Sequence, residues 1–104
     1  MLSHDDVRRL ALALPEAVEE DHHGRPSFRV AKKIFATLPD PDHVNIMLGP
    51  DDIALAAQHD GCAEVYWGKK LSAVGVDLRR APEALVAALL ADAWARRAPK
   101  RLLR

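Results

Sequence analysis

The sequence has 104 residues, a length that fits one domain, and 49% of its residues are hydrophobic, many of them alanine and leucine. Fifteen basic and fifteen acidic residues cancel, which excludes nucleic-acid binding through bulk positive charge and leaves only a local basic patch for that role. The single cysteine, Cys62, excludes an intramolecular disulfide framework.

The first segment, MLSHDDVRR, predicts a capped helix and has no apolar run of the kind found in a signal peptide. Ser3 can cap this helix, and Pro15 ends it. Its apolar residues recur at helical spacing and are Val7, Leu10, Ala11 and Leu14. The acidic run over residues 16–21 is interpreted as a solvated connector. No stretch approaches 18 continuous apolar residues, so we expect a cytoplasmic protein without a membrane partner.

Residues 27–48 predict three short strands. Apolar and polar side chains alternate over residues 27–30, which is the period-two pattern of a half-buried strand, and IFATL at residues 34–38 follows as its partner. The turn-forming segment PDPD occupies residues 39–42, and alternation returns over residues 44–48.

The second half of the chain predicts a helix, two strands and a long final helix. Pro50 and the acids after it begin the first of these helices, which ends at Gly61. Residues 63–67 and 72–78 form the fourth and fifth predicted strands around a GKK turn, and Pro82 begins the last helix. The apolar stripe of that helix consists of Leu85, Val86, Leu89, Leu90, Ala93 and Trp94.

The predicted order is α-β-β-β-α-β-β-α, without a parallel βαβ series and without an internal repeat. This order favours the α+β class: a two-layer α/β sandwich with an antiparallel five-stranded sheet and helices on one face. We expect one domain over residues 1–104.

Three segments carry a further signal. GRPSFRVAKKIFATL, residues 24–38, contains Gly-x-Pro-x-Phe-x-Val followed by Lys-x-Phe-Ala. WGKKLSAVGVDL, residues 67–78, joins a tryptophan-glycine turn to a strand ending in Asp-Leu, and ADAWARRAPKRLLR, residues 91–104, ends in an Ala-Pro-Lys-Arg tail. In this order and together, the segments resemble the MmcQ/YjbR-like family over most of the chain.

The resemblance implies the order α-β(3)-α-β(2)-α, similar to that of secretion chaperones, and a DNA-binding role with a double-wing mode. This sequence departs from the family at one place. The family often has glycine at the position of Ala31 or Lys32, where a tight turn requires positive φ.

Two predicted hairpin turns carry paired lysines, Lys32-Lys33 and Lys69-Lys70, where a tight turn usually prefers Asn-Gly or Asp-Gly. Two such tips could straddle a DNA duplex and contact its phosphates. Lysine suits this as a point charge, whereas base readout more often uses arginine, asparagine or glutamine. We therefore predict a non-catalytic protein that contacts the backbone of double-stranded DNA. The other candidate contacts are Arg25, Arg29, Lys100 and Arg101.

A structural explanation of the same residues competes with this one. Lysines at strand ends prevent edge-to-edge aggregation, and arginines at the end of the last helix complement its dipole. The alternative function is a protein-binding adaptor or chaperone-like module that uses its sheet face or edge and has no nucleic-acid role. Either function is compatible with a monomer or a weak homodimer.

Residues of metal-ligand type are present, but their pattern favours no metal and no cofactor. They are His22, His23, His59, Asp60 and Cys62. Adjacent histidines in a loop rarely bind one ion together, and the chain has no Cys-x-x-Cys pair. We interpret Cys62 as a partly buried structural residue.

The two tryptophans have different predicted roles. Trp94 lies on the apolar stripe of the last helix and is expected in the core. Trp67 lies beside the second lysine turn, where it could stack on a base or ligand. Because neighbouring strand residues point to opposite faces, we expect one of Tyr66 and Trp67 to point inward and the other outward.

Overall fold

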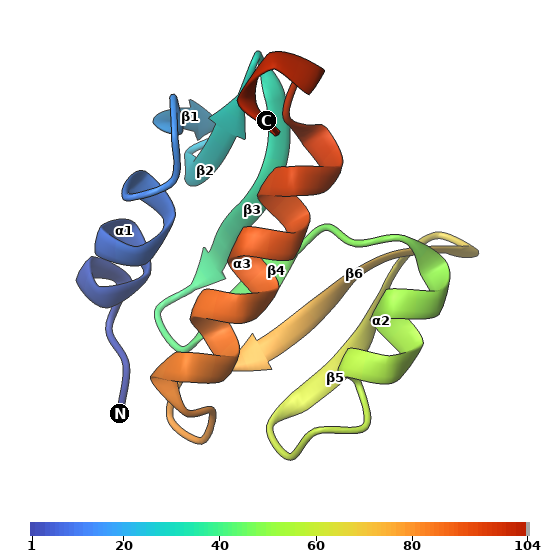
Figure 1. Cartoon of the computed structure of the whole chain (residues 1–104). Helices are drawn as coiled ribbons and strands as arrows, with labels where there is room; N and C mark the ends of the chain where they lie inside the picture. The colour runs from blue at the N-terminus through green and yellow to red at the C-terminus, as the bar shows by residue number, and fades with distance from the viewer. Residues whose placement is uncertain (104) are drawn as a thin grey trace.

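The computed structural model describes residues 1–103 and arranges them as one antiparallel sheet with helices packed on one side (Figure 1). In chain order the elements are α1 (His4–Leu12), β1 (Val18–His22), β2 (Arg25–Val30), β3 (Lys33–Asp40), β4 (His43–Ile46), α2 (Pro50–Ala56), β5 (Cys62–Trp67), β6 (Lys70–Asp77), α3 (Glu83–Arg97) and a 3₁₀ helix (Lys100–Leu102). The α+β class and the antiparallel sheet are confirmed. Among residues 1–103, no helix combines the length and the apolar character needed to cross a lipid bilayer.

The sheet has six strands in the order β1-β2-β3-β4-β6-β5, so the prediction of five strands is wrong by one. The additional strand is β1, most of which lies in the acidic run interpreted as a connector. All five of its residues are exposed, because β1 is an edge strand held by its backbone pairing to β2. A strand without a buried face has no apolar alternation, so the period-two pattern could not reveal it.

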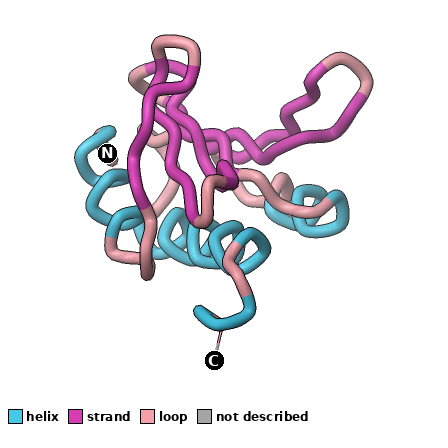
Figure 2. Tube along the Cα trace, turned by 90° about the horizontal axis from the view of Figure 1, so that it is seen from above, coloured by secondary structure: helices cyan, strands magenta, loops and turns pink. Residues whose placement is uncertain are grey.

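The helices form the second layer. α3 packs against β2, β3 and β4, α1 packs against α3, and α2 packs against β5 and β6. Figure 2 shows all three helices on one side of the strands, while hairpins rise from the sheet on the opposite side. The two-layer architecture therefore leaves one sheet face without a helical cover.

The first helix forms as its sequence predicts. The hydroxyl of Ser3 accepts a hydrogen bond from the backbone N–H of Asp6, and the Asp6 carboxylate accepts one from the N–H of Ser3, which completes a capping box. Val7 and Ala11 are fully buried at helical spacing. The helix ends at Leu12, ahead of Pro15.

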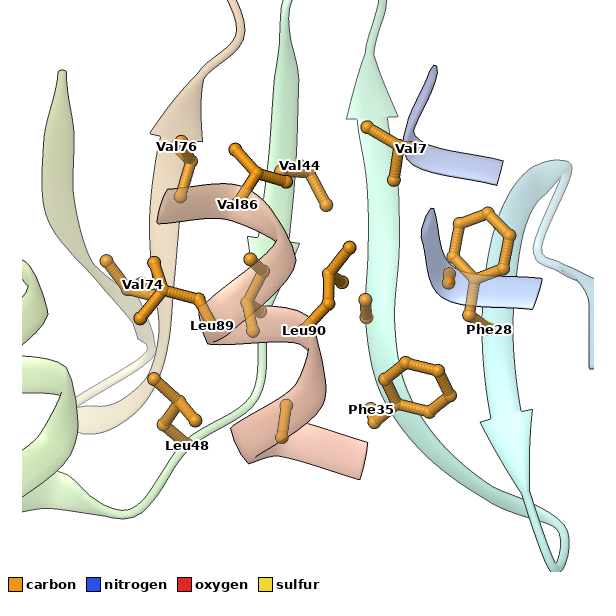
Figure 3. Close-up of a cluster of buried hydrophobic side chains, with 14 of the residues drawn as sticks. Val7, Phe28, Phe35, Val44, Leu48, Val74, Val76, Val86, Leu89 and Leu90 are labelled. Atoms are coloured by element: carbon orange, nitrogen blue, oxygen red, sulfur yellow. The ribbon is translucent and has the colours of Figure 1, made fainter. Parts of the chain in front are cut away.

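The core lies between the sheet and α3 (Figure 3). Phe28 of β2 and Phe35 of β3 fill the end near α1, while Leu90 of α3 lies over the middle of the sheet. The β2–β3 pairing shifts register next to Phe28, and this irregularity lets the consecutive residues Phe35 and Ala36 both be buried.

One half of the β5–β6 hairpin extends past the rest of the sheet. β4 pairs with β6 only over residues 43–46 against residues 74–77. The first residues of β6 pair with β5 alone, so the hairpin diverges from β3 and β4 toward the right of Figure 1. This divergence opens the uncovered face of the sheet beside β4.

Candidate functional site

Three two-residue turns with positive φ connect neighbouring strands of the sheet. The β1–β2 turn consists of His23 and Gly24, both with positive φ (54° and 83°). The β5–β6 turn consists of Gly68 and Lys69, with positive φ at Gly68 (63°). Positive φ at both central residues is the pattern of a type I′ turn, and glycine at the first position is the pattern of type II′.

The third turn, between β2 and β3, corrects a prediction. It consists of Ala31 and Lys32, because Val30 pairs with Lys33, whereas the sequence placed the turn at Lys32-Lys33. Ala31 and Lys32 have φ values of 49° and 68°, in the left-handed region where residues with a Cβ are disfavoured. The chain therefore has a lysine where glycine or asparagine would fit with less strain.

Only one lysine of each predicted pair lies within a turn. Lys32 and Lys69 are turn residues, while Lys33 and Lys70 are the first residues of β3 and β6. All four side chains are exposed. Each hairpin thus presents one lysine at its tip and a second one directly beside it.

A groove of about 690 Å³, here called the open-face groove, lies between the hairpins. The β1–β2 hairpin contributes His22, His23 and Arg25 to its lining, β3 contributes Lys33, and the carboxyl end of α3 contributes Arg97. Ile34, Thr37, Pro39, Asn45, Met47 and Trp67 complete the lining. Among residues 1–103, every side chain of acidic or basic type in this lining is basic or a histidine. The groove is therefore suited to an anion.

Arg97 differs from the other basic residues of the groove because it is half-buried. Its Nε atom is withdrawn from solvent and has no hydrogen-bond acceptor among residues 1–103. Burial, together with the nearby charge of Arg96, lowers the pKa of Arg97 below its ordinary value. The sequence interpretation gave Arg97 only a role at the helix dipole and missed its contribution to the groove.

Two predicted phosphate contacts are partly neutralised by acids. Both terminal nitrogens of Arg101 donate to the carboxylate of Glu16, at 2.6 and 2.8 Å. The Nε of Arg29 donates to Ser27 and lies 3.9 Å from a carboxylate oxygen of Glu20. The side chain of Arg29 is also largely covered, which makes it less accessible to a phosphate than the other candidate contacts. Arg25 and Lys100 are exposed.

The acidic run has a structural role that its sequence did not reveal. Glu16 binds Arg101, and Glu19 accepts a hydrogen bond from the Nε of Arg8 at 2.9 Å. These pairs join the β1 region to the tail and to α1. Because solvent screens exposed pairs of this kind, they add little to stability, and their main effect is to reduce the positive charge locally.

The prediction that one of Tyr66 and Trp67 points inward is wrong. Their side chains are 53% and 54% exposed, because the β5–β6 hairpin diverges from the core and shifts register beside Tyr66. Trp67 lines the open-face groove, while the hydroxyl of Tyr66 donates to Glu64. Trp94 is in the core as predicted, and its indole N–H donates to the carbonyl oxygen of Pro15.

Among residues 1–103, the residues considered as metal ligands do not come together in one cluster. Within residues 1–103, no three histidine, cysteine, aspartate or glutamate side chains are grouped closely enough to hold an ion. His22 and His23 lie in the β1–β2 hairpin, with ring centroids 4.5 Å apart. Cys62 is half-buried, and its pKa is raised by burial and by the charge of Asp60, which favours the protonated thiol.

Comparison with known proteins gives a family and nothing further. No curated protein and no solved structure matches the chain. The model of the YjbR family matches residues 12–96, which contain β1 to β6, α2 and nearly all of α3. This span includes the three hairpin turns described above. The chain therefore belongs to the YjbR family.

Proposed function

We propose that the protein binds double-stranded DNA without catalysis, through phosphate contacts from its hairpin turns. The observation that carries this proposal is the convergence of the hairpins on one basic groove. Arg25 from the β1–β2 hairpin, Lys33 from the β2–β3 hairpin and Trp67 from the β5–β6 hairpin line the same groove. The exposed tip lysines Lys32 and Lys69 belong to the same two hairpins.

The contacts expected to dominate are those predicted from the sequence that are exposed and have no carboxylate partner among residues 1–103. They are Arg25, Lys32, Lys33, Lys69, Lys70 and Lys100. Arg29 and Arg101 remain candidates, but Glu20 and Glu16 already lie beside them. Six phosphate contacts predict that the logarithm of the binding constant falls against the logarithm of salt concentration with a slope of about −5.

A titration of a labelled 20-base-pair duplex, followed by fluorescence anisotropy at several salt concentrations, tests this proposal. The variant K32A/K69A should reduce the magnitude of the salt slope by about 2, because it removes two phosphate contacts. The control variant R9A/R80A removes two charges from exposed ion pairs, with Glu83 and Asp60, and should leave the slope unchanged. If both variants reduce the magnitude of the salt slope equally, the hairpin lysines do not contact the phosphates specifically.

A protein-binding adaptor is the second candidate function, and one observation favours it. β5 is an edge strand, and its end carries the exposed aromatic residues Tyr66 and Trp67. A partner strand could add to this edge. Absence of DNA binding at low salt, together with self-association that is lost on replacing Tyr66, would support the adaptor. In either role we propose a cytoplasmic location, where the lone Cys62 stays reduced.

A further inference from the structure

We propose that the open-face groove binds a small anion that carries a planar ring, of the nucleoside monophosphate class. This proposal goes beyond DNA binding and does not rest on it. The groove brings a half-buried arginine, Arg97, and an exposed tryptophan, Trp67, into one lining with the basic residues Arg25 and Lys33. A ligand with a charged group and an aromatic group matches these two kinds of residue.

Arg97 is the residue that would bind the charged group of the ligand. A cation that is partly withdrawn from water, with no carboxylate to pair with, is costly to keep in a folded protein. Among residues 1–103 no ion pair includes Arg97, and its Nε has no acceptor. The terminal nitrogens of an arginine form paired hydrogen bonds with phosphate oxygens, and Arg25 and Lys33 add further positive charge.

Trp67 is the residue that would contact the planar ring of the ligand. Its indole is 54% exposed although it lines a groove, so a large aromatic surface is available there. Ile34 and Met47 add apolar surface to the same lining. Aromatic side chains bind unstacked bases through their faces, whichever base is present. The indole would therefore accept a free nucleobase.

The size of the groove separates this ligand from the alternatives. Its volume of about 690 Å³ lies within the range of about 300–1,000 Å³ that small-molecule sites occupy. Inorganic phosphate would leave the apolar lining uncovered. A DNA duplex keeps its bases stacked inside, so they cannot reach Trp67. Arg25 and Lys33 belong both to this lining and to the proposed DNA contacts, but the tip lysines Lys32 and Lys69 lie outside the lining, so replacing the tip lysines tests DNA binding without changing the groove.

Isothermal titration calorimetry with adenosine monophosphate as the probe tests the proposal. We expect saturable binding that is at least about tenfold tighter than binding of either inorganic phosphate or adenosine alone, since each presents only half of the matching chemistry. Quenching of tryptophan fluorescence should accompany binding, and Trp67→Phe should reduce that quenching because Trp94 is buried in the core. No binding at millimolar probe, or phosphate binding as tightly as the nucleotide, would overturn the proposal.

Three variants locate the site. Arg97→Met should weaken binding by about tenfold or more, because it removes a charge-assisted hydrogen bond while keeping the aliphatic part of the side chain. Arg96→Met is the matched control, since Arg96 is exposed and lies outside the lining. Trp67→Leu, at an exposed position where folding is little affected, should weaken binding about fivefold or more.

The DNA proposal and this one fail separately. K32A/K69A should bind adenosine monophosphate with the affinity of the wild type even if its affinity for DNA is reduced, because neither lysine lines the groove. If Arg97→Met and Arg96→Met weaken nucleotide binding equally, the effect is one of overall charge and the proposed site is wrong. If Trp67→Leu binds as tightly as the wild type, the groove does not recognise the ring and the proposal also fails.

Discussion

Replacing Lys32 by glycine should make the protein more stable and, at the same time, a weaker DNA binder. Lys32 has φ of 68°, a conformation that costs a residue with a Cβ about 1–2 kcal/mol. Glycine adopts it without that cost but loses about 0.5–1 kcal/mol through its more flexible unfolded state. The net expectation is a stabilisation of about 0.5–1 kcal/mol, or an increase in Tm of about 2–8 °C for a chain of this size.

Ala31→Gly is the matched control for this experiment. Ala31 occupies the other turn position with φ of 49°, so glycine there should give a similar stabilisation without removing a charge. Thermal unfolding by circular dichroism and DNA titration by anisotropy would be measured on both variants. Lys32→Gly should reduce the magnitude of the salt slope by about 0.9, whereas Ala31→Gly should not change it.

Two results would refute the reasoning. If Lys32→Gly lowers Tm while Ala31→Gly raises it, the lysine side chain stabilises the fold and the strain argument is wrong for that position. If both variants bind DNA as the wild type does, the lysine is retained at a strained turn position for a reason other than DNA contact.

Three further predictions concern the fold. Phe28→Ala, at a fully buried position, should lower the free energy of unfolding in a urea titration by about 3–5 kcal/mol, and a loss below about 1 kcal/mol would contradict its place in the core. Gly75→Ala should cost about 1–3 kcal/mol because its Cβ would lie 2.9 Å from the Cγ2 of Val65, and adding Val65→Ala should recover much of that loss if the clash is the cause. The side chain of Arg79, and then its backbone N–H, hold the pKa of Asp77 at about 2, against an ordinary 3.8. Since the folded carboxyl binds a proton less readily than the unfolded one, this contribution is present above about pH 4 and is lost as the pH falls toward 2. Arg79→Met should therefore reduce stability at pH 7 more than at pH 2.5, and equal losses at the two pH values would show that the linkage is absent.

The buried side chains could be predicted from the sequence wherever a segment has one buried and one exposed face. Val7 and Ala11 on α1, and Val44 and Ile46 on β4, follow the spacing of their elements and are buried as predicted. β1 was missed because both of its faces are exposed, and backbone pairing leaves no periodicity in side-chain type.

The candidate site was only partly predictable because it depends on distant segments coming together. The lysines of two hairpins could be identified from the sequence, but Ala31 and Lys32 do not themselves indicate a turn, because neither residue favours positive φ, and only the family's frequent glycine at this place pointed to it. Arg97 looked like an ordinary helix-end residue, and only the divergence of the β5–β6 hairpin brings it into one lining with Trp67.

The salt dependence of duplex binding by the wild type and by K32A/K69A tests the central claim most directly. If the hairpin turns bind phosphates, the wild-type slope is about −5 and the variant slope is about 2 smaller in magnitude, while both proteins unfold at similar temperatures. If the wild type does not bind the duplex even at about 20 mM salt, where the electrostatic attraction is strongest, the proposed DNA-binding function is wrong.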